Sequence, residues 1–378
     1  MPKHLVYCGT YTDPSLQGEV VPGRNPSVTE LTGLTGSDGI YVFEHDTGSG
    51  GFRHIHTVDG VVNPSYLALD RSEHFLFAVN ETREFDGDAS GAVSSFAIEP
   101  GTGIPRFVSQ RPSGGGNPCH VSVAPSGDYL LVANYEAATI ALLPIDAEGR
   151  LSPLVDLKTD EPVDPSGQRP PHAHFVTPDP GGAFVVSTDT GTDRVMSYRF
   201  DTEHGRLVPN DPAWGETHSG GGPRHLAFHP NGRFLYANGE ADLTLSVFRY
   251  DAEHGTLDHV QQLPTVPDGI DTAEFSTAQI VVHPGGRFVY VSNRGHDSIA
   301  VFQIDQVTGT ATRIAIESTR GRTPRNFMID PSGRFLYVAN QDSDAIECFT
   351  IDQRSGLLSH VRRAGDVPAP TCILFTTT

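Results

Sequence analysis

The sequence has little lysine and no long apolar run. Only two of its 26 basic residues are lysines, Lys3 and Lys158, against 46 acidic residues, and the net charge is -20. This charge argues against nucleic acid and anionic membrane surfaces as partners. The absence of an apolar window of about 18 residues excludes a transmembrane helix. The N-terminal residues also lack the pattern of a secretory signal, so we expect a cytoplasmic protein with no membrane partner.

Cysteine is also scarce, and no paired CxxC spacing occurs among Cys8, Cys119, Cys348 and Cys372. Each lies in a strand-like apolar run, which predicts buried free thiols rather than disulfides or metal ligands. The sequence contains no His-rich metal triad, nucleophile elbow or phosphate-binding glycine loop. We therefore expect neither a metal nor a cofactor.

The acidic excess is mostly aspartate, with 29 Asp against 17 Glu. A lysine-poor, acidic composition is typical of proteins that work in molar salt, where charges are screened within about 3 Å. A GC-rich genome that replaces lysine by arginine is the alternative, but it does not explain the acidic excess. The composition therefore favours a halophilic-like surface.

A repeated unit is clearest between Gly222 and Leu257. Three short apolar runs, Leu226 to Phe228, Phe234 to Ala237 and Leu245 to Tyr250, are separated by Pro, Gly, Asn and Asp. Such runs are typical of consecutive antiparallel strands. The unit is therefore predicted to be a β-meander.

The meander recurs seven times along the chain. Each copy begins at an anchor residue, usually proline, and successive anchors are 46 to 54 residues apart. Periods near 50 residues built from four short strands indicate propeller blades. We therefore predict an all-β fold, a single seven-bladed β-propeller domain over residues 1–378. The anchors are Pro64, Pro118, Pro171, Pro223, Thr277, Pro324 and Pro370.

The two ends of the chain predict how the ring closes. Residues His4 to Tyr11 resemble second strands of the repeat, whereas Pro370 to Phe375 resemble first strands. The C-terminal strand should therefore be the innermost strand of the N-terminal blade, which removes an exposed sheet edge.

Loop lengths predict which face carries the function. The turns between first and second strands are short and uniform, whereas variable segments all fall on the opposite face. Long irregular loops on one rim of a scaffold are typical of a functional face. These segments are Asp13 to Asp38, Thr82 to Gly91, Asp156 to Pro170, Val208 to Gly221 and Leu263 to Ser276.

Charged residues are predicted to gather at the channel mouth on that face. First strands begin there and second strands end there, so the anchors place His172, Arg224 and Arg325 at the mouth. His174 alternates with His172 and remains an alternative for the same position. Solvated salt bridges between blades are the alternative explanation for the whole set. Five further residues are predicted at or just below the mouth: His120, His225, Glu136, Glu240 and Arg294, with Asn293 beside them.

Several segments resemble one known family. They are Val-Tyr-Cys-Gly-Thr-Tyr-Thr at the start, Pro-His-Ala-His, Gly-Gly-Pro-Arg-His-Leu-Ala-Phe-His-Pro and Val-Ser-Asn-Arg-Gly-His-Asp-Ser-Ile. Over essentially its whole length the chain resembles the lactonase family of seven-bladed propellers, which includes 6-phosphogluconolactonases and a carboxymuconate lactonizing enzyme. By this similarity the family's active residues fall on His172, Arg224, Glu240 and Arg294.

The resemblance implies a hydrolase that opens a small anionic sugar lactone, as a 6-phosphogluconolactonase does. Such a reaction needs a base for water, donors for an oxyanion and an anchor for the substrate anion. His172 is the expected base, with Glu240 orienting it or the arginines. A cycloisomerase and a non-catalytic propeller that binds a protein remain alternatives, and the oligomeric state is left open. The expected substrate-binding residues are Arg325, His120, His225, Glu136 and Asn293.

Overall fold

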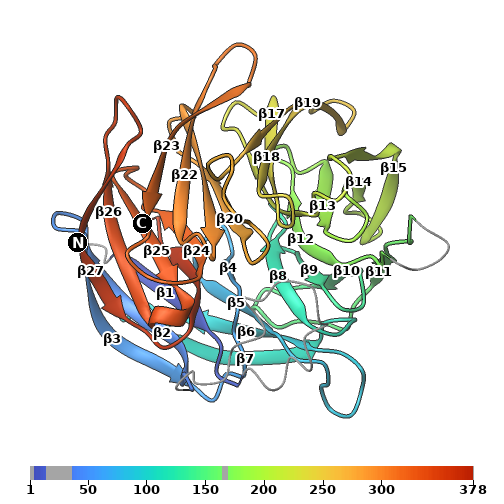
Figure 1. Ribbon diagram of the computed structural model, residues 1–378. Helices are drawn as coiled ribbons and strands as arrows, with labels where there is room; N and C mark the ends of the chain where they lie inside the picture. Colours follow the sequence, from blue (N-terminus) through green and yellow to red (C-terminus); the bar gives the residue numbers. More distant parts are fainter. Residues whose placement is uncertain (1–3, 14–35, 164–168, 378) are drawn as a thin grey trace.

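The computed structural model describes residues 4–13, 36–163 and 169–377, and in these ranges the chain forms seven four-stranded antiparallel sheets around a central axis (Figure 1). The sheets follow one another in sequence order as the blades of a propeller. This confirms the predicted seven-bladed fold. In the described part of the chain, no helix has the length and apolar composition needed to cross a membrane.

Blade 1 contains β28, β1, β2 and β3, and blades 2 to 7 take the remaining strands in groups of four from β4 to β27. The innermost strands are β4 (Leu67–Leu69), β8 (Pro118–Val123), β12 (Ala173–Pro178), β16 (Pro223–Phe228), β20 (Ser276–Val282), β24 (Pro324–Ile329) and β28 (Pro370–Phe375). The second strands are β1 (Leu5–Thr10), β5 (Phe75–Asn80), β9 (Tyr129–Asn134), β13 (Phe184–Asp189), β17 (Phe234–Gly239), β21 (Phe288–Arg294) and β25 (Phe335–Asn340).

The third strands are β2 (Gly39–Asp46), β6 (Ala92–Ile98), β10 (Thr139–Pro144), β14 (Arg194–Asp201), β18 (Thr244–Asp251), β22 (Ser298–Ile304) and β26 (Ala345–Ile351). The outermost strands are β3 (Gly51–Asp59), β7 (Pro105–Pro112), β11 (Asp156–Thr159), β15 (Arg206–Glu216), β19 (Thr256–Pro264), β23 (Ala311–Ser318) and β27 (Leu358–Asp366). A short 3-10 helix, η3 (Gln341–Ser343), follows β25.

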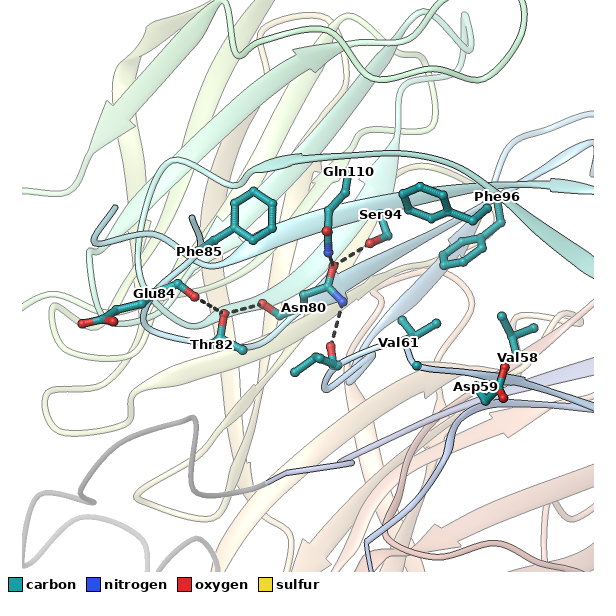
Figure 2. Close-up of a pocket in the computed structure, with 13 residues that line it drawn as sticks. Val58, Asp59, Val61, Asn80, Thr82, Glu84, Phe85, Ser94, Phe96 and Gln110 are labelled. Atoms are coloured by element: carbon teal, nitrogen blue, oxygen red, sulfur yellow. Dashed lines mark hydrogen bonds between the residues drawn. The ribbon is translucent and has the colours of Figure 1, made fainter. Parts of the chain in front are cut away.

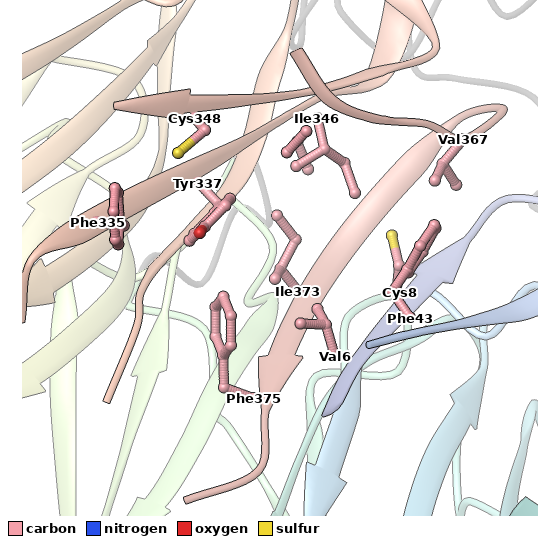
Figure 3. Close-up of a cluster of buried hydrophobic side chains, with 12 residues drawn as sticks. Val6, Cys8, Phe43, Phe335, Tyr337, Ile346, Cys348, Val367, Ile373 and Phe375 are labelled. Carbon is pink, nitrogen blue, oxygen red and sulfur yellow. The ribbon is translucent and has the colours of Figure 1, made fainter. Parts of the chain in front are cut away.

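Blade 1 is closed as the sequence predicts. β28 pairs antiparallel with β1, with Val6 opposite Phe375 and Cys8 opposite Ile373. Side chains of blades 1 and 7 form one buried cluster at this junction (Figure 3). Tyr337 of blade 7 stacks on Phe52 of blade 1, with ring centroids 4.6 Å apart. Burial of each large apolar side chain in such a cluster contributes about 1.5–3 kcal/mol, so the closure is held by packing as well as by strand pairing.

Short turns on the face opposite the long loops also link neighbouring blades. His229 accepts the amide of Asn231 within its own turn, and its Nε2 donates to the carbonyl of Gly286 in the next blade at 2.8 Å. His283 repeats this contact with the carbonyl of Gly333 at 2.9 Å. These histidines therefore stabilise the turns and join neighbouring blades.

The predictions for two of the loop segments are wrong in part, because each segment contains part of a strand. Asp156–Thr159 forms β11, and residues 208–216 belong to β15. β15 pairs with β14 across an irregularity between Met196 and Tyr198, and as an outermost strand it tolerates Pro209 and Pro212. Prolines made this segment look like a loop. Most of the segment from Asp13 to Asp38 lies outside the described residues, whereas Thr82 to Gly91 lies between strands as predicted.

All four cysteines are free thiols and buried, which confirms the prediction.

Candidate active site

A repeated irregularity in the innermost strands aims side chains at the axis. In β16 the pairing with β17 skips one residue between Pro223 and His225, and the skipped residue is Arg224. The same skip occurs at Cys119 in β8, His174 in β12 and Arg325 in β24. Bulges of this kind redirect a side chain out of the regular pleat. Four blades therefore present Cys119, His174, Arg224 and Arg325 at equivalent positions.

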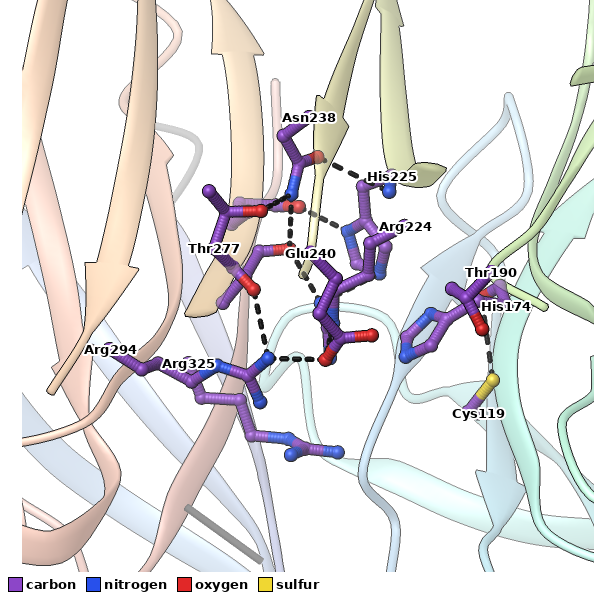
Figure 4. A network of polar contacts seen from close by, with 12 residues as sticks. Cys119, His174, Thr190, Arg224, His225, Asn238, Glu240, Thr277, Arg294 and Arg325 are labelled. Carbon is purple, nitrogen blue, oxygen red and sulfur yellow. Dashed lines mark hydrogen bonds and ion pairs between the residues drawn. The ribbon is translucent and has the colours of Figure 1, made fainter. Parts of the chain in front are cut away.

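Arg294 and Glu240 form the central ion pair of the site. Glu240 directly follows β17 of blade 5, and Arg294 ends β21 of blade 6. The Nη2 of Arg294 donates to Glu240 Oε1 at 2.5 Å and to the carbonyl of Thr277 at 2.8 Å. Arg294 is only 1% exposed, so its position is fixed by these contacts and by packing. Figure 4 shows Arg224, Glu240, Arg294 and Arg325 directed toward a common centre.

Arg224 lies on the other side of the same carboxylate. Its Nη1 donates to the carbonyl of Ala278 at 2.5 Å, and its Nε lies 3.5 Å from Glu240 Oε1. Burial and the neighbouring Arg294 lower the pKa of Arg224 to about 9, while Glu240 opposes this shift. The site therefore holds two guanidinium groups close together in a buried environment. A bound anion would stabilise their charged forms.

Glu240 is ionised in this arrangement. Burial raises the pKa of its carboxyl group, but Arg294 and Arg224 outweigh burial and hold that pKa below its ordinary value. Burial also lowers the pKa of Arg294. Among the described residues, no acceptor makes a well-formed hydrogen bond with the buried Nε of either arginine. Arg224 Nε still faces Glu240 Oε1 at 3.5 Å, whereas Arg294 Nε has no acceptor among the described residues.

Arg325 belongs to a second group of contacts that includes Tyr11 and Glu81. Its guanidinium lies 4.8 Å from the centroid of the Tyr11 ring and hydrogen bonds to the Tyr11 hydroxyl. Tyr11 in turn donates to Glu81 at 3.0 Å, and Glu81 also accepts from Ser65. Although burial opposes it, Tyr11 and Glu81 hold the pKa of Arg325 above its ordinary value. Sequence reasoning did not select Tyr11 or Glu81, although both end second-strand segments at the predicted mouth.

The structure corrects the register of blade 4. Ala173, not Pro171, pairs with Asp189 as Pro223 pairs with Gly239. His174 is therefore the equivalent of Arg224, and His172 lies two residues farther toward the loop-rich face. Counting back from the turn proline reveals this: seven residues separate Pro230 from Pro223, and seven separate Pro180 from Ala173.

The two histidines of blade 4 have different environments. His174 is buried, its Nδ1 has no hydrogen-bond partner among the described residues, and burial and Arg224 lower its pKa well below the usual range. His172 is half-buried; its Nδ1 lies 3.1 Å from the carbonyl of Tyr135, and its ring stacks on the Tyr135 ring at 4.4 Å. Tyr135 also contacts His174. His172 is thus linked to the arginine cluster through Tyr135 and His174.

His120 and His225 form a layer beneath the arginines. His225 Nδ1 lies 2.5 Å from the side-chain carbonyl of Gln279 and must donate to it, so His225 Nε2 accepts from Arg224 Nη1 at 3.2 Å. His120 is sandwiched between Tyr66 and Phe175, with centroid distances of 4.2 and 3.8 Å. Burial followed by Arg224 lowers the pKa of both rings. Because both rings are buried, we assign them to the support of Arg224 and not to the predicted contact with substrate.

Two other predicted binding residues have structural contacts. Glu136 is 42% exposed at its side chain and pairs with Arg83 at 2.9 Å, at the edge of the mouth. Asn293 is buried, and its amide donates to Ser298 Oγ at 3.1 Å and to the Thr265 carbonyl at 3.3 Å. Asn134 and Asn340 make the same kind of contact to backbone carbonyls of Ser113 and Thr319, in the segments that lead from the preceding blade into their own. Asn293 therefore makes a structural contact that recurs from blade to blade.

A cavity of about 500 Å³ lies away from this cluster, between blades 1 and 2 (Figure 2). Its walls include Val61, Phe96 and Phe107. The polar groups there bond to one another: Asn80 accepts from Ser94 and from Gln110. The cavity has no arginine or histidine in its lining, so it does not compete with the channel mouth as a catalytic site.

The chain is similar to known proteins along its full length. A family model described as a seven-bladed β-propeller lactonase matches residues 6–375. A Bacillus subtilis protein named 6-phosphogluconolactonase is 30% identical over 332 residues, which cover 87% of this chain and 85% of that protein. A Formosa agariphila protein of the same name is 30% identical over 296 residues, or 77% and 82% of the two chains. The structure of the periplasmic gluconolactonase of Pseudomonas aeruginosa is similar with a TM-score of 0.84 and 31% identity, covering 99% of each chain.

Proposed function

Because the chain belongs to the lactonase family of seven-bladed β-propellers, we propose that it is an enzyme that hydrolyses the ring ester of a small anionic sugar lactone. The names of its relatives favour 6-phosphogluconolactone as the substrate. The channel mouth with its three arginines is the proposed site.

The main support for this proposal is the pair of guanidinium groups, from Arg224 and Arg294, that contact the Glu240 carboxylate. Arg224 and Arg294 are both buried and fixed by backbone carbonyls, and the Nε of each has no well-formed hydrogen bond within the described chain. A lactone carbonyl develops negative charge on its oxygen as water attacks. Preorganised donors in a water-poor site stabilise that charge without having to reorganise. We assign this role to Arg224 and Arg294.

Arg325 is the proposed anchor for the anionic group of the substrate. Its side chain is 11% exposed, more than that of Arg224 or Arg294, and Tyr11 and Glu81 hold it in place. A guanidinium binds phosphate or carboxylate through two parallel hydrogen bonds. A phosphate on the sugar would thus reach Arg325 while the ring carbonyl lies over the other two arginines.

His172 is the proposed base. A backbone carbonyl only accepts, so the contact with Tyr135 places a proton on His172 Nδ1 and leaves the lone pair of the neutral ring on Nε2. Nε2 takes a proton from water as the water oxygen attacks the carbonyl carbon. The ring C–O bond then breaks, and the imidazolium returns the proton to the leaving oxygen. His174 is less suitable, because burial and then the nearby Arg224 lower its pKa and oppose its protonation.

The alternatives make different demands on the site. A cycloisomerase of the carboxymuconate type would need the same arginines but would act on a carboxylate in place of a phosphate. A panel of lactones tests the proposal: 6-phosphogluconolactone, unphosphorylated gluconolactone and a carboxylated muconolactone. Selective acceleration of the phosphorylated sugar lactone supports it. Turnover of the carboxylated lactone alone, or of none, would reassign the site.

A further inference from the structure

A single hydroxyl group joins the opposite charges of Arg325 and Glu81. Arg325 Nη2 lies 3.8 Å from Glu81 Oε2, which is too long for a hydrogen bond. The Tyr11 hydroxyl accepts a hydrogen bond from Arg325 Nη2 and lies 3.0 Å from both oxygens of the Glu81 carboxylate. Because a phenol has one proton to donate, Tyr11 donates to Glu81 and accepts from Arg325. The two charged groups are therefore linked through Tyr11 and do not bond to each other.

The Tyr11 ring also packs against the guanidinium. Its centroid lies 4.8 Å from the central guanidinium carbon of Arg325, within the range of a cation–π contact. Tyr11 is 2% exposed and Glu81 is 8% exposed, so bulk water has little access to the space between them. The hydroxyl and the ring of Tyr11 therefore set the position of the Arg325 guanidinium together.

Asn63 fixes the spacing between Tyr11 and Glu81. Its side-chain oxygen accepts the amides of Thr12 and Asp13, which follow Tyr11, at 2.9 and 2.8 Å. Its side-chain amide donates to the backbone carbonyl of Glu81 at 3.1 Å, and its own carbonyl accepts the Glu81 amide at 3.1 Å. Asn63 is fully buried. It thus holds the segment after β1 of blade 1 against the segment after β5 of blade 2.

Glu81 and Arg325 are each held by a further contact. Ser65 Oγ donates to Glu81 Oε2, and the backbone amide of Arg325 donates to the carbonyl of Thr323 at 2.7 Å. Of the guanidinium nitrogens of Arg325, only Nη2 has a hydrogen-bond acceptor among the described residues. While Nη2 stays on Tyr11, Nε and Nη1 therefore keep their hydrogens for a ligand at the channel mouth.

We propose that Tyr11 is a positioning residue that keeps Arg325 free to bind the anionic group of the substrate. This inference rests on the proposed role of Arg325 as the anion anchor. A guanidinium and a carboxylate that meet directly form a bidentate pair, which would occupy the donors that a phosphate needs. The Tyr11 hydroxyl lies where Arg325 and Glu81 would meet and so prevents that pair. Glu81 still balances the buried positive charge through Tyr11.

Phosphate binding tests this role without depending on turnover. Isothermal titration calorimetry in a fixed excess of KCl, which screens the acidic surface, measures the affinity for inorganic phosphate. Tyr11→Phe keeps the ring but removes the hydroxyl, so Arg325 should pair with Glu81 and the affinity should fall about 2- to 10-fold. In an Arg325→Ala background, Tyr11→Phe should have no further effect on the affinity, because the anchor is already absent.

A rescue variant separates this role from a merely structural one. Glu81→Gln added to Tyr11→Phe removes the charge that would capture Arg325, so the phosphate affinity should return at least to the wild-type value. Tyr236→Phe is the matched control, since Tyr236 is also buried and donates to the Gly309 carbonyl at 2.8 Å. It should lose stability without losing phosphate affinity. Wild-type affinity in Tyr11→Phe, or an affinity that Glu81→Gln does not restore, would overturn the inference.

Kinetics distinguish a failure of this inference from a failure of the proposed function. Tyr11→Phe should raise KM for 6-phosphogluconolactone by the same factor and leave kcat, and KM for unphosphorylated gluconolactone, nearly unchanged. If the chain opens no lactone but binds phosphate with the expected pattern, the positioning role stands and the proposed function fails. If it opens the lactone with an unchanged KM in Tyr11→Phe, or if the wild type binds no phosphate, the positioning role fails.

Discussion

Arg294 of blade 6 donates to Glu240 of blade 5 at 2.5 Å. The same carboxylate oxygen lies 3.5 Å from Arg224 Nε, so one negative charge holds two buried guanidinium groups side by side. Neither arginine would be stable in this position as an isolated buried charge. The geometry of the proposed oxyanion site therefore depends on Glu240.

The change Glu240→Gln should weaken the fold and increase its response to anions. It leaves two buried arginines with no opposite charge, which costs about 3–5 kcal/mol when a buried pair is broken. We expect a lower free energy of unfolding in urea, with phosphate stabilising this variant more than the wild type. Glu136→Gln, at an exposed pair with Arg83, is the control and should change little.

The difference in unfolding free energy between the wild type and Glu240→Gln should depend on pH. The pKa of Glu240 is lowered in the folded protein, so its stabilisation is complete above the unfolded-state value of about 4.3 and disappears as pH falls through the folded-state value. The wild type and Glu240→Gln should therefore converge in stability toward low pH. If the difference in unfolding free energy stayed constant across this pH range, the ion pair of Glu240 would not be its cause.

Arg325→Ala should separate binding from catalysis. Loss of a charge-assisted contact to an anion costs about 1.5–3 kcal/mol, or roughly a 10- to 100-fold change in affinity. We expect KM for a phosphorylated lactone to rise by that factor, with a much smaller change for an unphosphorylated lactone. Arg320→Ala, a 53% exposed residue paired with Glu317, is the matched control. Equal effects on both substrates would show that Arg325 does not contact the phosphate.

The two histidines of blade 4 should respond differently to replacement by asparagine. His172→Asn removes the proposed base and should lower kcat by about 10²- to 10⁴-fold with little change in KM. It should also abolish the acid limb of the pH–rate profile. His174→Asn should retain that limb, because the buried His174 stays neutral across the working range. The reverse pattern would transfer the role of base to His174.

Most of the fold could be predicted from the sequence, because each blade repeats the same turn residues. In blade 5 the repeat correctly predicts the register of Pro223 and Arg224 relative to Glu240. In blade 4 it does not, because a proline precedes His172 while Ala173 takes the anchor position. Strands that contain proline, such as β15, have the sequence pattern of a loop for a related reason.

Other features of the site depend on contacts between blades that no single repeat reveals. Tyr11 reaches Arg325 only because the N-terminal strand closes the ring beside the last blade. The burial of His120 and His225 depends on Tyr66, Phe175 and Gln279 from neighbouring blades.

The acidic composition leads to a prediction about salt. A net charge of -20 repels itself in dilute buffer, and molar salt screens that repulsion. We expect a higher melting temperature in molar KCl than in dilute buffer, measured at equal pH. Equal melting temperatures would leave nucleotide composition as the explanation for the lack of lysine.

The central claim is that the arginine-lined mouth opens an anionic lactone, and the initial rate of 6-phosphogluconolactone ring opening tests it most directly. Proton release followed in a weakly buffered solution gives this rate after subtraction of spontaneous hydrolysis. The account predicts saturable acceleration by the wild type and its loss in His172→Asn, with normal folding verified by circular dichroism. A wild-type rate equal to the spontaneous rate, or an unchanged rate in His172→Asn, would contradict it.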